Sequence, residues 1–213
     1  MSLVFPDVQG LSYRSPSQRI RVLSESWMKD EMYCPACGNN NLLRINSSTN
    51  PNLFILHYHD RLIEDLMLIP KHFFTPDILK MRRALSPNAR RAGYVGAVIM
   101  YSDIPERGKI AVVQSHSELN RDIVMKSYAH SVRLKVENIN LRGWVMDVLR
   151  CMDKIASEVF SLDDMYSFVQ ELSAKHPDNH NVTAKIRQQL QFLRDKGFVE
   201  FLGVGMYRKI ISV

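Results

Sequence analysis

The strongest constraint on the fold of this chain is a regular pattern in its C-terminal part. From Trp144 onwards, apolar residues recur at helical spacing in three separate stripes. The stripes are Trp144, Val148, Met152 and Ile155; then Leu162, Met165, Phe168, Val169 and Leu172; then Val182, Ile186, Leu190 and Leu193. Ser161 and Asp164 have the spacing of a capping box, and Gly197 follows the third stripe as a stop signal. The sequence therefore predicts three successive helices.

A β-hairpin is predicted directly after the third helix. Phe198–Leu202 and Met206–Ile210 have the character of strands, and the tight Gly203-Val204-Gly205 joins them. Three helices followed by a two-stranded hairpin is the order of a winged helix. We therefore expect a winged-helix domain over residues 141–213, another domain over residues 1–140, and a boundary near Asn138–Arg142.

The third helix of this domain carries the candidate DNA-reading residues. Each residue advances about 100° around a helix, so placing Val182, Ile186 and Leu190 inward turns a polar set outward. That set is His180, Asn181, Ala184, Arg187, Gln188 and Gln191. Asn and Gln can bind adenine bidentately in the major groove, and Arg can bind guanine. Arg208 and Lys209 on the hairpin would meet phosphate. The alternative is a winged helix that binds protein and has no salt-dependent affinity for DNA.

The N-terminal part mixes helix and strand signals. Ser15 and Pro16 begin a helix that ends near Glu31. Further on, four segments are predicted as strands: Leu53–Tyr58, Leu62–Ile69, Gly93–Met100 and Lys109–Gln114. His59-Asp60-Arg61 is the expected turn between the first two, and Pro70–Ala92 is expected to be mostly loop with a short helical turn. The fold class is thus α/β or α+β around a central sheet.

The charge of the chain favours a polyanionic partner. The formal net charge is +6 and the pI is about 9.3. One basic cluster spans residues 71–91 and a second spans residues 179–213. Each alone is equally well explained as a solvated face, but two in one chain favour nucleic acid. No apolar run is long enough to span a membrane. The absence of a secretory signal and the odd count of three cysteines indicate the cytoplasm.

Several strings resemble the DpnI family, restriction endonucleases that cut DNA containing N6-methyladenine. In the N-terminal part these are Cys34-Pro-Ala-Cys37-Gly-Asn-Asn, Pro51-Asn-Leu-Phe and Leu85-Ser-Pro-Asn-Ala-Arg-Arg-Ala-Gly-Tyr94. In the C-terminal part they are Arg142-Gly-Trp144, Cys151-Met-Asp-Lys-Ile155, Lys185-Ile-Arg-Gln-Gln-Leu-Gln-Phe-Leu-Arg-Asp-Lys-Gly197 and Tyr207-Arg-Lys209. They occur in family order over nearly the whole chain.

The resemblance implies an N-terminal PD-(D/E)XK nuclease domain with a zinc site and a C-terminal winged helix, both recognising methylated GATC in double-stranded DNA. It also implies a monomer in the bacterial cytoplasm. The aromatic residue that helps form the methyladenine pocket of the family, usually Trp, corresponds here to Tyr94, with Arg90 and Arg91 beside it on phosphates. The alternative is that Tyr94 is a core residue at the start of the Gly93–Met100 strand.

The chain departs from the family at its catalytic segment. The acidic and lysine residues that bind Mg²⁺ and activate water lie, in the family, between positions that correspond to the adjacent Asn50 and Pro51. No Glu-x-Lys, Asp-x-Lys or Gln-x-Lys occurs, and no lysine follows Asp60, Glu64 or Asp65 at that spacing. The nuclease-like domain is thus incomplete and no catalytic residue is assigned. Mg²⁺-dependent cleavage is expected only if a segment exists there; the alternative is a methyl-DNA reader or transcriptional regulator without nuclease activity.

Cys34 and Cys37 are spaced like half of a structural zinc site, which needs four ligands. His57 and His59, two apart on a predicted strand, could complete an unusual site, although satisfied or exposed histidines explain them more simply. The resemblance implies that a second Cys-x-x-Cys in the absent segment supplies the other ligands.

Overall fold

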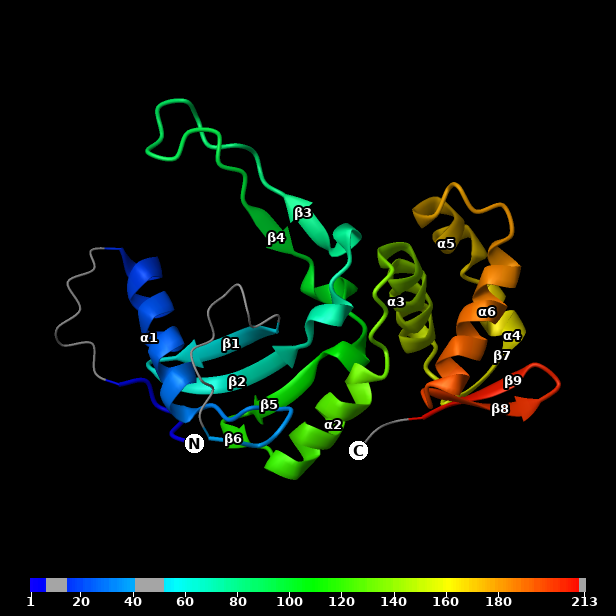
Figure 1. The fold of residues 1–213 in the computed structure, drawn as a ribbon, viewed down its shortest axis with the longest axis horizontal. Helices are drawn as coiled ribbons and strands as arrows, with labels where there is room; N and C mark the ends of the chain where they lie inside the picture. The colour runs from blue at the N-terminus through cyan, green and yellow to red at the C-terminus, as the bar shows by residue number, and fades with distance from the viewer. Residues whose placement is uncertain (7–14, 41–51, 211–213) are drawn as a thin grey trace. The chain divides into compact units, whose positions relative to one another are not determined.

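The computed structural model describes residues 1–6, 15–40 and 52–210 (Figure 1). Helices combine with antiparallel sheets, which confirms the predicted α+β class. The chain groups into two compact units: Met1–Lys71 with Lys109–Val132, and His72–Gly108 with Arg133–Ser212. The Asn50–Pro51 junction lies outside the described residues. No helix in the described ranges is long and apolar enough to cross a membrane.

In the residues that the structure describes, the first unit contains an antiparallel sheet and two helices. Its strands are β1 (Leu53–His59), β2 (Leu62–Ile69), β5 (Ile110–Gln114) and β6 (Ser117–Glu118), in the order β1-β2-β5-β6. The helices are α1 (Pro16–Glu31) and α2 (Arg121–Val132). Asp60 and Arg61 take positive φ values of 45° and 71°, as a tight hairpin turn requires, so the predicted turn between β1 and β2 is confirmed. Helix α1 is confirmed with Pro16 in its first turn, whereas α2 was not predicted.

The core of this unit lies between the sheet and the N-terminal elements. Trp27 of α1 and Ile63 and Leu66 of β2 are among its buried residues, together with Tyr33 and Val124. The indole Nε1 of Trp27 donates to the carbonyl oxygen of Ser2 at 2.7 Å, which ties the start of the chain to the helix.

The segment His72–Gly108 departs most from the prediction. The expected loop Pro70–Ala92 contains the strand β3 (Leu79–Met81), and the expected strand Gly93–Met100 shortens to β4 (Ala97–Ile99). The two strands pair in antiparallel register, with Lys80 opposite Val98. Four 3-10 turns flank them: η1 (Lys71–Phe73), η2 (Pro76–Ile78), η3 (Tyr101–Asp103) and η4 (Glu106–Gly108). We call residues 79–99 the arm.

The C-terminal part has the predicted winged-helix order, with two corrections. Its helices are α3 (Ile139–Lys154), α4 (Leu162–Tyr166), α5 (Val169–Lys175) and α6 (Val182–Asp195). Its sheet has the order β7-β9-β8, formed by β7 (Val159–Ser161), β8 (Val199–Gly203) and β9 (Met206–Lys209). The expected second helix is thus two short helices, and strand β7 was missed. The capping box of Ser161 and Asp164 is confirmed.

The boundaries of the two compact units differ from those of the predicted domains. Residues 72–108, which the sequence assigned to an N-terminal domain, group with the winged helix. Buried residues of this segment include Phe73, Ile78 and Ile104. The assignment of residues 1–140 and 141–213 to separate domains stays a prediction.

Candidate nucleic-acid interface

Helix α6 presents one apolar and one polar face. Val182, Ile186, Leu190 and Leu193 are buried, as the spacing predicts. The predicted outward residues are all exposed: His180, Asn181, Ala184, Arg187, Gln188 and Gln191. This confirms the orientation of the helix, while their contacts with bases stay predictions.

Two of the outward residues already have intramolecular roles. Asn181 caps α6, its side-chain oxygen accepting from the amide nitrogen of Ala184 at 3.2 Å. The side-chain oxygen of Gln188 accepts from Lys185 Nζ at 2.8 Å. Arg187 and Gln191, one turn apart, make no hydrogen bond or ion pair with other residues of the described chain. They are therefore the best candidates for base contacts on this helix.

The hairpin does not bring its two predicted phosphate contacts together. Arg208 and Lys209 are neighbours on β9, so their side chains point to opposite faces of the sheet. Arg208 is exposed and pairs with Glu200 Oε2 across the strands at 3.0 Å. Lys209 Nζ donates to the carbonyl oxygen of Ile155, and its burial lowers the pKa of the ammonium. Arg208 is accordingly the better candidate for a phosphate contact.

The arm concentrates positive charge on an exposed ribbon. Between residues 79 and 98, every residue except Ala89 and Gly96 is exposed. The arm carries Lys80, Arg82, Arg83, Arg90 and Arg91 and contains no acidic residue. An exposed ribbon with uncompensated positive charge suits a polyanion, and the major groove of B-DNA admits a two-stranded ribbon.

Tyr94 lies on the arm and is 54% exposed, so the alternative that it is a core residue is wrong. Its amide nitrogen donates to the Arg91 carbonyl oxygen at 3.1 Å, and its carbonyl oxygen accepts from the Leu85 amide at 2.9 Å. The Arg91 guanidinium carbon lies 5.2 Å from the ring centroid, within the range of a cation–π contact. These contacts hold the backbone of the turn while leaving much of the ring open.

The two faces of the arm differ in chemistry. Directly opposite residues share a face, so Leu79 and Met81 lie with Ile99 and Ala97 on an apolar face. Lys80 and Arg82 lie on the other face, at Val98 and Gly96. A Cβ on Gly96 would lie 3.6 Å from Arg82 Cδ and 3.7 Å from Tyr94 Cε1, which places the ring on this second side. We call Lys80, Arg82, Arg91 and Tyr94 the basic face of the arm; Arg90 is exposed in the same loop.

Sequence reasoning found this cluster of charge but not its geometry. The sequence predicts a basic cluster over residues 71–91, but it does not single out Lys80 and Arg82 as site residues. The signal that could have identified them is their alternation along a stretch free of acids.

Cys34 and Cys37 lie in a hydrogen-bonded turn that follows α1. The Cys34 amide donates to the Asn39 carbonyl oxygen, and the Gly38 amide donates to the Cys34 carbonyl oxygen, both at 2.8 Å. Although burial opposes it, the backbone amides of Ala36 and Cys37 and the Cys37 thiol lower the pKa of Cys34. A lowered pKa favours the thiolate that binds metal. The turn thus fits two ligands of a structural zinc site.

The proposed histidine ligands have other neighbours. His57 lies 3.8 Å from Asp65, and His59 lies 3.4 Å from Asp60. Within residues 1–6, 15–40 and 52–210, no three side chains of His, Cys, Asp or Glu gather where they could hold a metal ion. The histidine and cysteine pairs therefore do not form one site, and the zinc and Mg²⁺ assignments stay predictions.

Comparison with protein families assigns the class of the molecule and then its family. A family model described as the Dam-replacing HTH domain matches residues 140–209, so the winged helix is a helix-turn-helix domain and DNA is its partner. A model described as the Dam-replacing family matches residues 1–44 and 40–137. The chain therefore belongs to the DpnI, or Dam-replacing, family of methylation-dependent restriction enzymes.

Proposed function

We propose that this chain recognises GATC in duplex DNA when its adenine carries an N6-methyl group, with α6 in the major groove and Tyr94 against the methyl group. The observation that carries the proposal is the exposed Tyr94 ring on an arm with five cations and no acid. An aromatic face is a suitable wall for a methyl group, and neighbouring cations hold phosphates without reading sequence. Family membership supplies the link to methylated DNA.

Arg187 and Gln191 are proposed as the base-reading pair. They are one turn apart on the exposed face of α6, where a guanidinium can reach guanine and an amide can reach adenine. Arg208 and the cations of the arm supply phosphate contacts. The protein acts in this proposal as a monomer in the bacterial cytoplasm, with Cys34 and Cys37 as half of a zinc site that stabilises the first unit.

We propose cleavage only for a chain in which an additional segment, inserted between Asn50 and Pro51, supplies the acidic and lysine residues of the catalytic site. The sequence as printed has carboxylates but no lysine at the required spacing. For this chain the proposed activity is therefore binding. Cutting of methylated plasmid with Mg²⁺, by protein whose intact mass is 24.6 kDa, would contradict that restriction.

The test compares variants of α6 on specific and scrambled duplexes. Arg187→Ala and Gln191→Ala should each weaken binding to methylated GATC by about 1–3 kcal/mol and affect scrambled duplex less. Arg194→Ala is the matched control, since Arg194 lies on the same helix but pairs with Asp195 at 2.9 Å. If each substitution weakens binding equally on both duplexes, Arg187 and Gln191 contact the DNA backbone and do not read bases. A wild-type chain without preference for GATC would refute the proposed function.

A further inference from the structure

Two cysteines lie together in an exposed turn of the first unit. We call residues 34–40, which follow α1, the cysteine turn. The sulfur of Cys34 accepts hydrogen bonds from the backbone amides of Ala36 and Cys37 and from the Cys37 thiol, so the two sulfur atoms lie within hydrogen-bonding distance. Cys37 is exposed and Cys34 is half-buried. The pair can therefore bind one metal ion and remains accessible to a ligand from another molecule.

Helix α2 holds the cysteine turn in place. Arg121 Nη1 donates to the side-chain oxygen of Asn40 at 2.6 Å and to the carbonyl oxygen of Gly38 at 3.3 Å. The Arg121 guanidinium carbon also lies 4.3 Å from the ring centroid of Tyr33. A Cβ on Gly38 would lie 3.0 Å from the Met125 sulfur, so the turn packs closely against this helix. The turn is thus fixed in position and has a cation beside it.

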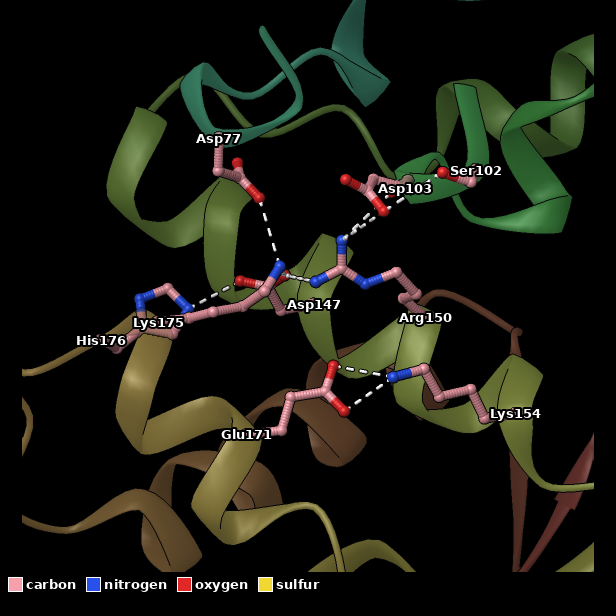
Figure 2. A network of polar contacts seen from close by, with 9 residues as sticks. All are labelled: Asp77, Ser102, Asp103, Asp147, Arg150, Lys154, Glu171, Lys175 and His176. Atoms are coloured by element: carbon pink, nitrogen blue, oxygen red, sulfur yellow. Dashed lines mark hydrogen bonds and ion pairs between the residues drawn. The ribbon is translucent and has the colours of Figure 1, made fainter. Parts of the chain in front are cut away.

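The chain does not supply a second pair of ligands for this turn. Its third cysteine, Cys151, is fully buried in α3. His176 lies 2.8 Å from Asp147 in a separate network of polar contacts (Figure 2). In residues 1–6, 15–40 and 52–210 no group of three metal-binding side chains forms, and residues 7–14, 41–51 and 211–213 contain no cysteine or histidine. A structural zinc ion needs four ligands, so the other two have to come from another molecule.

A second copy of the same chain offers the missing pair. A tetrahedral ion bound by two identical pairs of cysteines has a twofold axis that exchanges the pairs, and twofold dimers are the commonest homo-oligomers. Four thiolates around one Zn²⁺ leave an excess of negative charge. Each copy brings the Arg121 guanidinium next to its own cysteine turn, which offsets that charge.

We propose that one Zn²⁺ joins two copies of this chain through Cys34 and Cys37 of each copy. The inference limits the proposed monomer to the zinc-free chain, and it does not depend on the recognition of methylated DNA. The metal itself is the bond between the two chains, so removing the metal separates them.

The test adds Zn²⁺ in steps to the full chain, which is first freed of metal and kept reduced with a phosphine. Native mass spectrometry and sedimentation then report the mass and the metal content of the particles. We expect the mass to rise from 24.6 kDa to twice that value, with one Zn²⁺ for every two chains. Excess EDTA should restore the monomer.

X-ray absorption at the zinc edge identifies the ligands directly. The dimer should show four sulfur neighbours at about 2.3 Å from the zinc ion. Because the chain has only three cysteines and one of them is buried in α3, four sulfur ligands require both copies. A zinc ion with two sulfur neighbours, or one Zn²⁺ on each monomeric chain, would overturn the inference.

Two variants assign the effect to the cysteine turn. Cys37→Ser removes one ligand at an exposed position, so it should stay folded and remain a monomer when Zn²⁺ is added. Cys151→Ala is the matched control: it removes the buried cysteine and should dimerise like the wild type. Zinc-dependent dimerisation of Cys37→Ser would overturn the inference. The EDTA-treated wild type gives the same comparison without a substitution. No step contains DNA, so these results are independent of whether the proposed function holds.

Discussion

Replacing Tyr94 by alanine removes the proposed methyl wall with little expected damage to the fold. Tyr94 is 54% exposed, and the guanidinium carbon of Arg91 lies 5.2 Å from its ring centroid. An exposed cation–π contact contributes only about 0.5–1 kcal/mol. Burying one methyl-sized group is worth about 0.8 kcal/mol, and 1.4 kcal/mol corresponds to a factor of ten. Discrimination through this contact should therefore be about fourfold.

Tyr94→Ala should accordingly shrink the ratio of methylated to unmethylated affinity by up to about fourfold, with a melting temperature close to that of the wild type. Tyr94→Trp should preserve or raise the ratio because it enlarges the aromatic face. Leu85→Ala is the control, since Leu85 is an exposed apolar residue of the arm without a π face. Fluorescence anisotropy titrations of both duplexes at one salt concentration, with thermal melts in parallel, give both quantities. An unchanged ratio in Tyr94→Ala would refute the pocket assignment.

Two further predictions concern the stability of the second compact unit. A Cβ on Gly108 would lie 2.6 Å from the buried Phe73 ring, so Gly108→Ala should lower the stability of the fold by about 1–3 kcal/mol in thermal melts. Gly143→Ala is the control and should not lower it, because its Cβ would lie 3.8 Å from His176. Equal melting temperatures of the two variants would contradict this prediction. Hydrogen bonds from Ser161 lower the pKa of Asp164, so its stabilisation is present above the unfolded pKa near 4 and is lost as the pH falls through the folded value. Asp164→Asn should thus melt below the wild type at pH 7 and approach it below about pH 4, whereas a difference independent of pH would contradict this role.

The sequence predicted the elements whose faces are buried. Helices α1, α3 and α6 and the hairpin of β1 and β2 were located correctly because burial imposes a clear period on their apolar residues. Strands β3 and β4 lack that signal. Each has only three residues on an exposed ribbon, so no buried face imposes an alternation of apolar and polar side chains. Helix α2 was missed because Val124 is its only buried apolar residue.

The sequence predicted the part of the candidate site that lies on a single helix. The outward face of α6 needed only the helical period, and all six residues are exposed. The basic face of the arm depends on how Lys80 and Arg82 pair with the opposite strand, which no local pattern fixes. Arg121 holds the Gly38 carbonyl of the cysteine turn 83 positions away, and such a contact exists only after folding.

The most direct test of the account is the affinity of the intact 24.6 kDa chain for two duplexes that differ only in methylation. Both contain one GATC site, and one carries N6-methyladenine on both strands. At a single salt concentration, the chain should bind the methylated duplex more tightly, by about fourfold if the methyl contact alone discriminates. Equal affinities for the two duplexes would contradict the proposed function.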